Sequence, residues 1–252
     1  MATYAYRDKN RKDVIYASNA IEKNRNERFY CPNPLCDAHL HICAIDGCKK
    51  AYFGATQKDY PHIKKCSFAA DSSEFNDDEF DESKFNFENA MANLFVSTDK
   101  PQKRKGPGEH ESGDVKKHPP TTLRQIYLMC KSRPIADMYG NEEIGAMILD
   151  DRSLYRYPKG CFGNRIIEAC VRGRFYDDKS RKITVYAPIQ NPKYSFQLQF
   201  EEADEDVYHA IRKALYNNQE KIVVIAGKWE KTEIFNCFSS KCYGRKQIYM
   251  KK

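Results

Sequence analysis

The chain has 252 residues, of which 31% are charged, and a formal net charge of +7. No apolar run approaches the roughly 20 residues of a membrane-spanning helix, and the polar N-terminus lacks the apolar stretch of a secretory signal. These features argue against a membrane or exported protein and predict a cytoplasmic one with no membrane partner. In that reducing compartment we expect the ten cysteines to be metal ligands or buried thiols rather than disulfides.

The charge is distributed unevenly. Lys and Arg exceed Asp and Glu by five in residues 1–70 and by seven in residues 121–252, whereas the acids exceed the bases by five in residues 71–120. We therefore divide the chain into a zinc-binding module (1–70), an acidic segment with a short helix and a flexible linker (71–120), and a C-terminal domain (121–252). Two basic units around an acidic one indicate a polyanionic partner, although a slightly basic soluble surface explains the same imbalance.

Half of the cysteines and half of the histidines fall within residues 31–66. A segment this small cannot stabilise itself by burial alone, and a structural zinc ion removes that problem. Zinc takes four thiolate or imidazole ligands in a tetrahedron, usually delivered as two close pairs. The favoured set is Cys31 and Cys36 from a Pro-containing turn, with His62 and Cys66 from one face of a short helix. A hairpin turning at Asp46-Gly47 between the pairs would complete a ββα arrangement.

Two alternatives remain open at this stage. Cys43 and Cys48 repeat the C-x4-C spacing, so an all-thiolate site of Cys31, Cys36, Cys43 and Cys48 is one, and a module without metal is the other. His39 and His41 alternate with apolar residues and are expected on a solvated strand face. There is no HExxH motif and no Glu beside a ligand pair, so the metal is expected to be structural and the protein not an enzyme.

The order A-x-R-D-K-N-R-K-D-V-I-Y-A, then FYCPNPLC, then a strand pair and PHIKKC, resembles the N-terminal zinc-finger region of competence CoiA-like proteins. The resemblance covers only about residues 4–68, and the C-x4-C turn and the final ligand Cys66 depart from the family pattern. The nuclease half of that family is not recognisable, because no strand-borne Asp followed by Glu-x-Lys comes after the linker. The resemblance therefore implies a nucleic-acid context rather than cleavage.

The acidic segment opens with DSSEFNDDEFDE, which is too polar to build a core. After it, Phe87, Ala90, Met91, Leu94 and Phe95 recur at helical spacing and predict a helix within residues 85–97, which could dock a protein partner. Residues 97–120 are rich in Lys, Pro and Gly and predict a flexible linker.

The C-terminal half begins with helices expected at residues 121–133 and 141–150. Strands are then expected at residues 165–175, 182–189 and 194–200, a helix after Asp204, and further strands at 221–229, 233–240 and 246–252. Trp229 falls on an inward face and is expected in the core. This order resembles the OB-fold, so the predicted class is α+β: a small zinc-finger module plus a five-stranded OB-like β-barrel with one inserted helix.

An OB-fold commonly binds oligonucleotides across its second and third strands and the loops that join strands 1–2 and 4–5. Lysines and arginines interleaved with aromatic rings suit a single strand, because phosphates meet the cations while bases stack on the rings. The candidate residues expected in the 1–2 loop are Tyr176, Lys179, Arg181 and Lys182, and those expected in the 4–5 loop are Lys241, Tyr243, Arg245 and Lys246. The outward face of the first strand adds Arg172 and Arg174, on the side that also shows Glu168 and Cys170, and the second strand adds Tyr186. The alternative interpretation is that these rings close the ends of the barrel and that the lysines and arginines are solvated at the tips of the hairpins. Cys237 and Cys242 form another C-x4-C pair, expected to be edge thiols rather than a second zinc site.

The leading hypothesis is a zinc-containing, non-enzymatic protein that binds nucleic acid, single-stranded DNA or RNA, through its OB-like domain. The alternatives are a protein–protein adaptor of a mobile element or phage, and a nuclease accessory subunit. The acidic residues 71–87 are further expected to mimic nucleic acid and occupy the basic groove.

Overall fold

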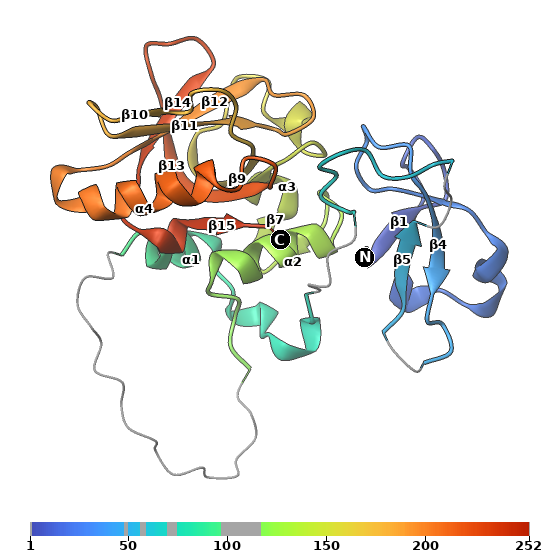
Figure 1. The fold of residues 1–252 in the computed structure, drawn as a ribbon. Coiled ribbons are helices and arrows are strands. Elements are labelled where there is room, and N and C mark those ends of the chain that lie inside the picture. The colour runs from blue at the N-terminus through green and yellow to red at the C-terminus, as the bar shows by residue number, and fades with distance from the viewer. Residues whose placement is uncertain (1, 48–49, 56–58, 70–74, 97–116, 252) are drawn as a thin grey trace.

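The computed structural model describes residues 2–47, 50–55, 59–69, 75–96 and 117–251. It is a mixed α+β structure, as predicted, with a five-stranded sheet near the N-terminus and an eight-stranded sheet with helices around it (Figure 1). In these ranges, no helix is long and apolar enough to cross a membrane.

The N-terminal sheet has the order β2-β1-β3-β4-β5, with antiparallel neighbours throughout. Its strands are β1 (Tyr4–Tyr6), β2 (Val14–Tyr16), β3 (Phe29–Tyr30), β4 (His39–Cys43) and β5 (Tyr52–Ala55). The predicted hairpin is present as β4 and β5, with Cys43 opposite Tyr52. The predicted ββα arrangement is wrong, because the segment around His62 and Cys66 is a turn rather than a helix. Lys65 there has a φ of 59°, which is incompatible with a continuing right-handed helix.

The middle of the chain contains 3₁₀ turns at Asp77–Glu79 and Glu82–Lys84, followed by helix α1 (Phe87–Leu94). Helix α1 begins at Asn86, whose side chain accepts a hydrogen bond from the Asn89 N–H, and it buries the apolar face that the spacing predicted. Within the acidic stretch, Phe75 is buried in the same core and Phe80 packs against it, so the expectation that this stretch is too polar to build a core is wrong. Its phenylalanines pack inward while its carboxylates stay outside. The predicted linker falls largely on residues 97–116, which lie outside the described residues.

Helix α2 (Leu123–Ser132) begins where predicted, and Thr122 and Gln125 cap it reciprocally. The helix expected at 141–150 is mostly replaced by short pieces: β7 (Glu142–Glu143), α3 (Ile144–Met147) and β8 (Ile148–Leu149). Strand β7 pairs with β6 (Met138–Tyr139), and β8 pairs in parallel with β9. Because the residues on both sides of α3 pair as strands, the helix in this segment has only four residues.

The large sheet has the order β10-β11-β12-β14-β13-β9-β8, and β15 pairs with β13. Its remaining strands are β9 (Gly163–Ala169), β10 (Tyr176–Asp177), β11 (Lys182–Ala187), β12 (Tyr194–Gln199), β13 (Val223–Lys231), β14 (Cys237–Lys241) and β15 (Ile248–Met250). Helix α4 (Glu205–Tyr216) joins β12 to β13, and β12 runs parallel to β14. The sheet is not closed into a barrel by a continuous ladder, since β9 and β11 share no ladder and Cys170, directly after β9, forms only an isolated bridge to Tyr186 of β11.

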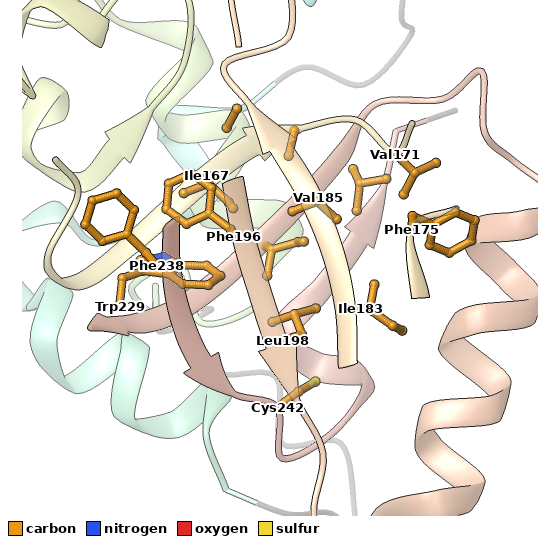
Figure 2. Close-up of a cluster of buried hydrophobic side chains, with 14 of the residues drawn as sticks. Ile167, Val171, Phe175, Ile183, Val185, Phe196, Leu198, Trp229, Phe238 and Cys242 are labelled. Carbon is orange, nitrogen blue, oxygen red and sulfur yellow. The ribbon is translucent and has the colours of Figure 1, made fainter. Parts of the chain in front are cut away.

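Two cores flank this sheet. One face carries a cluster that includes Phe196, Phe238 and Trp229, whose ring is buried as predicted (Figure 2). The second core forms where α1 and α2 cover the other face of β9 and β13. Both faces of β9 are therefore buried, and the expectation that Glu168 and Cys170 point outward is wrong. Strands β11 and β12 instead alternate between buried and half-buried residues.

Candidate metal centre and outer sheet face

The structure gathers the four residues that the sequence favoured as metal ligands. The ligand atoms of Cys31, Cys36, His62 and Cys66 all lie within 4.8 Å of one another. The sulfur atoms of Cys31 and Cys66 are 3.7 Å apart, and the Cys36 sulfur is 3.4 Å from Nδ1 of His62. The three cysteines are buried and His62 is half-buried. Three thiols and one imidazole converging on one point can hold a metal ion such as zinc.

The turn between Cys31 and Cys36 is built by its own backbone. Cys31 comes directly after β3, and its N–H donates to the carbonyl of Ala38. The Cys36 N–H donates to the carbonyl of Asn33, whose side-chain oxygen accepts from the Leu35 N–H. These bonds point both sulfur atoms to the same side of the turn.

Arg11 fixes this turn from another part of the chain, and the sequence analysis did not identify it. Its guanidinium donates to the carbonyl oxygens of Cys31 at 3.0 Å, Asn33 at 2.9 Å and Cys36 at 2.8 Å. It orients the two ligand residues through their backbone and brings a positive charge close to them, which favours thiolates. Because 20 residues separate Arg11 from Cys31, no local pattern could reveal this contact.

The three thiols of the candidate metal centre differ in pKa. Hydrogen bonds from Cys31 and Cys66 hold the pKa of Cys36 far below its usual range, whereas burial raises the pKa of Cys31. The bond to Cys31 lowers the pKa of Cys66, but its bond to Cys36 and its burial outweigh that effect and raise it to about 12. Without metal the cluster therefore favours a single thiolate, and a divalent ion would displace the remaining thiol protons.

The other candidate ligands lie elsewhere. Cys43 is in β4, with its sulfur 3.1 Å from Nε2 of His41, and does not belong to the gathered group. Cys48 lies outside the described residues, so the structure describes three of the four residues of the all-thiolate set, Cys31, Cys36 and Cys43. His39 is buried and stacks on Tyr60 with ring centroids 3.8 Å apart, so its expected solvated position is wrong.

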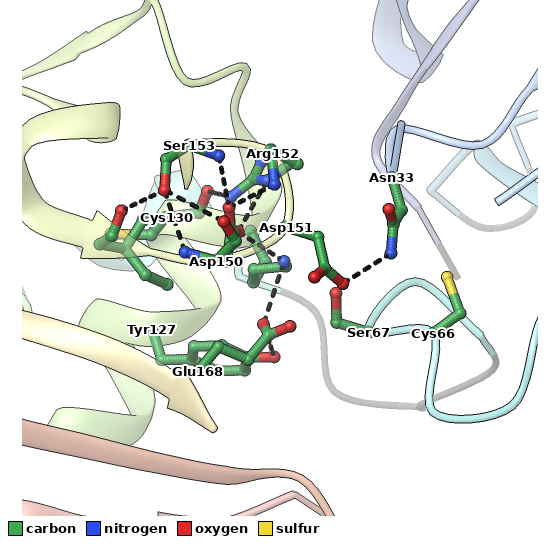
Figure 3. Close-up of polar contacts among 12 residues, drawn as sticks. Asn33, Cys66, Ser67, Tyr127, Cys130, Asp150, Asp151, Arg152, Ser153 and Glu168 are labelled. Carbon is green, nitrogen blue, oxygen red and sulfur yellow. Dashed lines mark hydrogen bonds and ion pairs between the residues drawn. The ribbon is translucent and has the colours of Figure 1, made fainter. Parts of the chain in front are cut away.

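A buried group of charges lies beside the metal centre, at the contact between the two sheets (Figure 3). The Lys131 ammonium is 2.8 Å from Asp150 and 3.1 Å from Glu168, and Arg152 is 2.8 Å from Asp150. Burial alone raises the pKa of Asp150, but the charges of Arg152 and Lys131 outweigh it and hold that pKa below its usual range. We call Lys131, Asp150, Arg152 and Glu168 the buried charge cluster.

The N-terminal module docks directly onto this cluster. Arg152 donates to the hydroxyl of Tyr4 at 2.7 Å, and the Lys131 ammonium lies 4.4 Å from the centroid of the Phe68 ring. Asn33, inside the ligand turn, donates to Asp151 at 3.1 Å. Both ligand segments therefore carry residues that contact the C-terminal part of the chain, and a metal ion would stabilise the docking surface as well as the module.

The C-terminal candidates separate into two groups. One group lies on the half-exposed side of β11, β12 and β14, which we call the outer face. It consists of Lys182, Thr184 and Tyr186 of β11, Ser195, Gln197 and Gln199 of β12, and Ser239 and Lys241 of β14. The register places Lys182, Gln199 and Lys241 in one row across the strands. The structure thus brings Lys182, Tyr186 and Lys241, three of the predicted residues, onto one surface.

The other predicted residues lie around this face. Arg172 and Arg174 are exposed in the segment between β9 and β10 rather than on a strand, and Lys179 and Arg181 belong to the turn between β10 and β11. Tyr176 packs under Arg212 of α4, with the guanidinium 5.1 Å from its ring centroid, which points to a structural role.

Tyr243, Arg245 and Lys246 follow β14, so their assignment to the loop between the fourth and fifth strands is wrong. Strand β13 continues to Lys231, and that loop is residues 232–236 instead. At its tip Ile234 and Phe235 are 60% and 85% exposed, a feature that the sequence analysis missed. Cys237 and Cys242 are buried, and burial raises the pKa of Cys242 to about 12.

Comparisons of the chain with protein-family models, with curated proteins and with solved structures each gave no match. The resemblance of residues 4–68 to CoiA-like proteins therefore stays a prediction.

Proposed function

We propose that this is a zinc-containing protein that binds single-stranded nucleic acid on the outer face of an OB-type domain. The observation that carries the proposal is the outer face itself. Gln199 lies between Lys182 and Lys241 in one row, and the next row contains Thr184, Gln197 and Ser239. The ring of Tyr186 lies beside Ser195 on the same surface. Cations for phosphates, rings for stacking and polar groups for base edges are what single strands require.

The strand pairing supports an OB-type domain. Strand β9 touches β11 through one bridge, β11 pairs with β12, β12 runs parallel to β14, β14 pairs with β13, and β13 returns to β9. In chain order, helix α4 lies between the third and the fourth of these strands, β12 and β13. This is the order expected of a five-stranded, partly open Greek-key barrel, in which the second and third strands bind the ligand.

The metal centre has a structural rather than a catalytic role in this proposal. Cys31, Cys36, His62 and Cys66 supply four ligands, which complete a tetrahedral zinc site and leave no position for a reacting water molecule. A bound ion would hold the turn and the Cys66 segment against the C-terminal part of the chain.

Among residues 75–87, the part of the acidic segment that the structure describes, the ion pairs of the carboxylates lie away from the outer face. Asp77 and Glu82 form ion pairs with Arg133, and Asp78 pairs with Lys50. None of these cations belongs to the outer face, so the expected mimicry of nucleic acid is not part of the proposal.

Fluorescence anisotropy with a labelled 20-nucleotide single strand tests the proposal. The double variant Lys182→Ala/Tyr186→Ala should lose about tenfold or more in affinity, since stacking on one ring contributes roughly 1–3 kcal/mol. Raising the salt concentration should weaken binding by the wild type, because phosphate contacts release counterions. The matched control is Lys213→Ala/Tyr216→Ala on α4, which removes the same residue types from an exposed helix and should leave affinity unchanged. Equal losses in both variants, or no binding by the wild type, would contradict the proposal.

A protein adaptor is the second candidate, and the exposed Ile234 and Phe235 at the β13–β14 tip favour it. Helix α1, which was expected to dock a protein partner, does not favour the adaptor, because its apolar face is buried within this chain. An Ile234→Ser/Phe235→Ser variant that loses a protein partner while retaining oligonucleotide affinity would support the adaptor.

A further inference from the structure

A pocket of about 290 Å³ lies where the outer face reaches β13 and the end of α1. The rings of Phe95 and Tyr243 line one part of it, with centroids 6.2 Å apart and planes inclined at 43°. Gln199 and Lys241 contribute from the outer face. The volume is just below the usual range for ligand pockets, about 300–1,000 Å³, and suits one planar group rather than a large ligand.

Strand β13 adds two charged side chains to this pocket. Glu230 lies opposite Ser239 in the strand register, and Lys228 is two residues earlier on the same side of the strand. The residue between them, Trp229, points the other way and is buried. The alternation of the strand therefore directs Glu230 and Lys228 to the outside, where the outer face continues.

The charged groups of the pocket suit different parts of a nucleotide. Lys228 and Lys241 are cations suited to a phosphate, although Lys241 also pairs with Glu201 at 2.8 Å. Glu230 is exposed, and an ionised carboxylate only accepts hydrogen bonds. Amino groups of cytosine and adenine can donate to it, whereas thymine and uracil present a carbonyl oxygen at the corresponding position.

We propose that this pocket binds one base of the single strand, with its ring against Phe95 and Tyr243, and that Glu230 selects a base with an exocyclic amino group. This inference rests on the proposed function and adds a base preference to it. Glu230 is a specificity-determining residue in this arrangement, while the two rings supply affinity that does not depend on the base.

Anisotropy measurements with the full chain and labelled 15-nucleotide oligo-dC, oligo-dA and oligo-dT at pH 7.5 test the preference. We expect the wild type to bind oligo-dC and oligo-dA at least fivefold more tightly than oligo-dT. Glu230→Gln should bring the three affinities to within about twofold of one another, because an amide both donates and accepts. Tyr243→Ala should weaken all three by a similar factor.

Glu233→Gln is the matched control, since it removes the same charge from an exposed position in the nearby β13–β14 loop. It should keep the preference of the wild type. Wild-type binding without a base preference, or an equal change in Glu230→Gln and Glu233→Gln, overturns the pocket assignment and leaves the proposed function standing. Absence of binding to every oligonucleotide overturns both.

Discussion

The N-terminal sheet and the C-terminal sheet of this chain are stabilised by different means. The five N-terminal strands have two to five residues each, and three buried cysteines belong to their core. The C-terminal sheet includes β13 with nine residues and has a hydrophobic core on each side. Because small units bury too little apolar area to be stable alone, we expect the N-terminal module to depend on metal ligation and docking, whereas the C-terminal part has a sufficient core.

The two regions also differ in what they leave exposed. In the N-terminal module the sulfur atoms of the candidate ligands are buried, and they contact one another or the imidazole of His62. In the C-terminal sheet, α1 and α2 cover β9 and β13 but the outer face keeps its polar side chains half-exposed. The first arrangement suits a structural site and the second suits a binding surface.

The largest effect should follow from removing a metal ligand. With Cys31→Ser, or with a chelator, we expect the N-terminal module to unfold while the C-terminal core persists, since a structural metal is lost. Native mass spectrometry would show the loss of one zinc ion, and limited proteolysis would cut within residues 1–69 first. Cys43→Ser should retain the metal. If the Cys31→Ser variant is as resistant to protease as the wild type, the N-terminal module does not need the metal for stability. That result would contradict the proposed difference in how the two regions are stabilised.

The next effect concerns the buried charge cluster that joins the regions. Arg152→Met leaves Asp150 without one of its two cations and should cost roughly 3–5 kcal/mol of unfolding free energy. Arg156→Met is the comparison, because the more exposed pair of Arg156 with Glu143 contributes about 1 kcal/mol or less. Urea denaturation would measure both. Similar costs for the two variants would show that burial does not determine the strength of these pairs.

The smallest effect is a pH dependence at the contact between the regions. Burial and the charge of Glu168 raise the pKa of Asp151 from 3.8 to about 6. Because the folded state favours the protonated acid, this group stabilises it fully below pH 3.8, and that contribution is lost as the pH rises through about 6. Asp151→Asn should flatten the dependence of the melting temperature between pH 4.5 and 7. An unchanged pH profile in this variant would assign the dependence to other groups.

Much of the local structure could be predicted because it depends on near neighbours. Thr122 and Gln125 mark the start of α2, helical spacing marks the buried face of α1, and alternation marks β12. The same local rules misplaced the loop before β14, because strand β13 extends through the polar residues Glu230 and Lys231. They also placed Glu168 outside, because alternation cannot reveal that a helix covers the second face.

The sequence by itself identified the four residues that meet as a candidate metal site, because a cluster of cysteine and histidine in a short segment restricts which side chains can meet around one ion. It also determined the α+β class and the order of strands around α4. Only the tertiary structure decided that Arg11 orients the ligand turn, that a buried charge cluster joins the two regions, and that Phe95 meets Tyr243 beside Glu230. These contacts join residues far apart in the chain, and their free energy depends on burial and distance, which no local pattern of residues specifies.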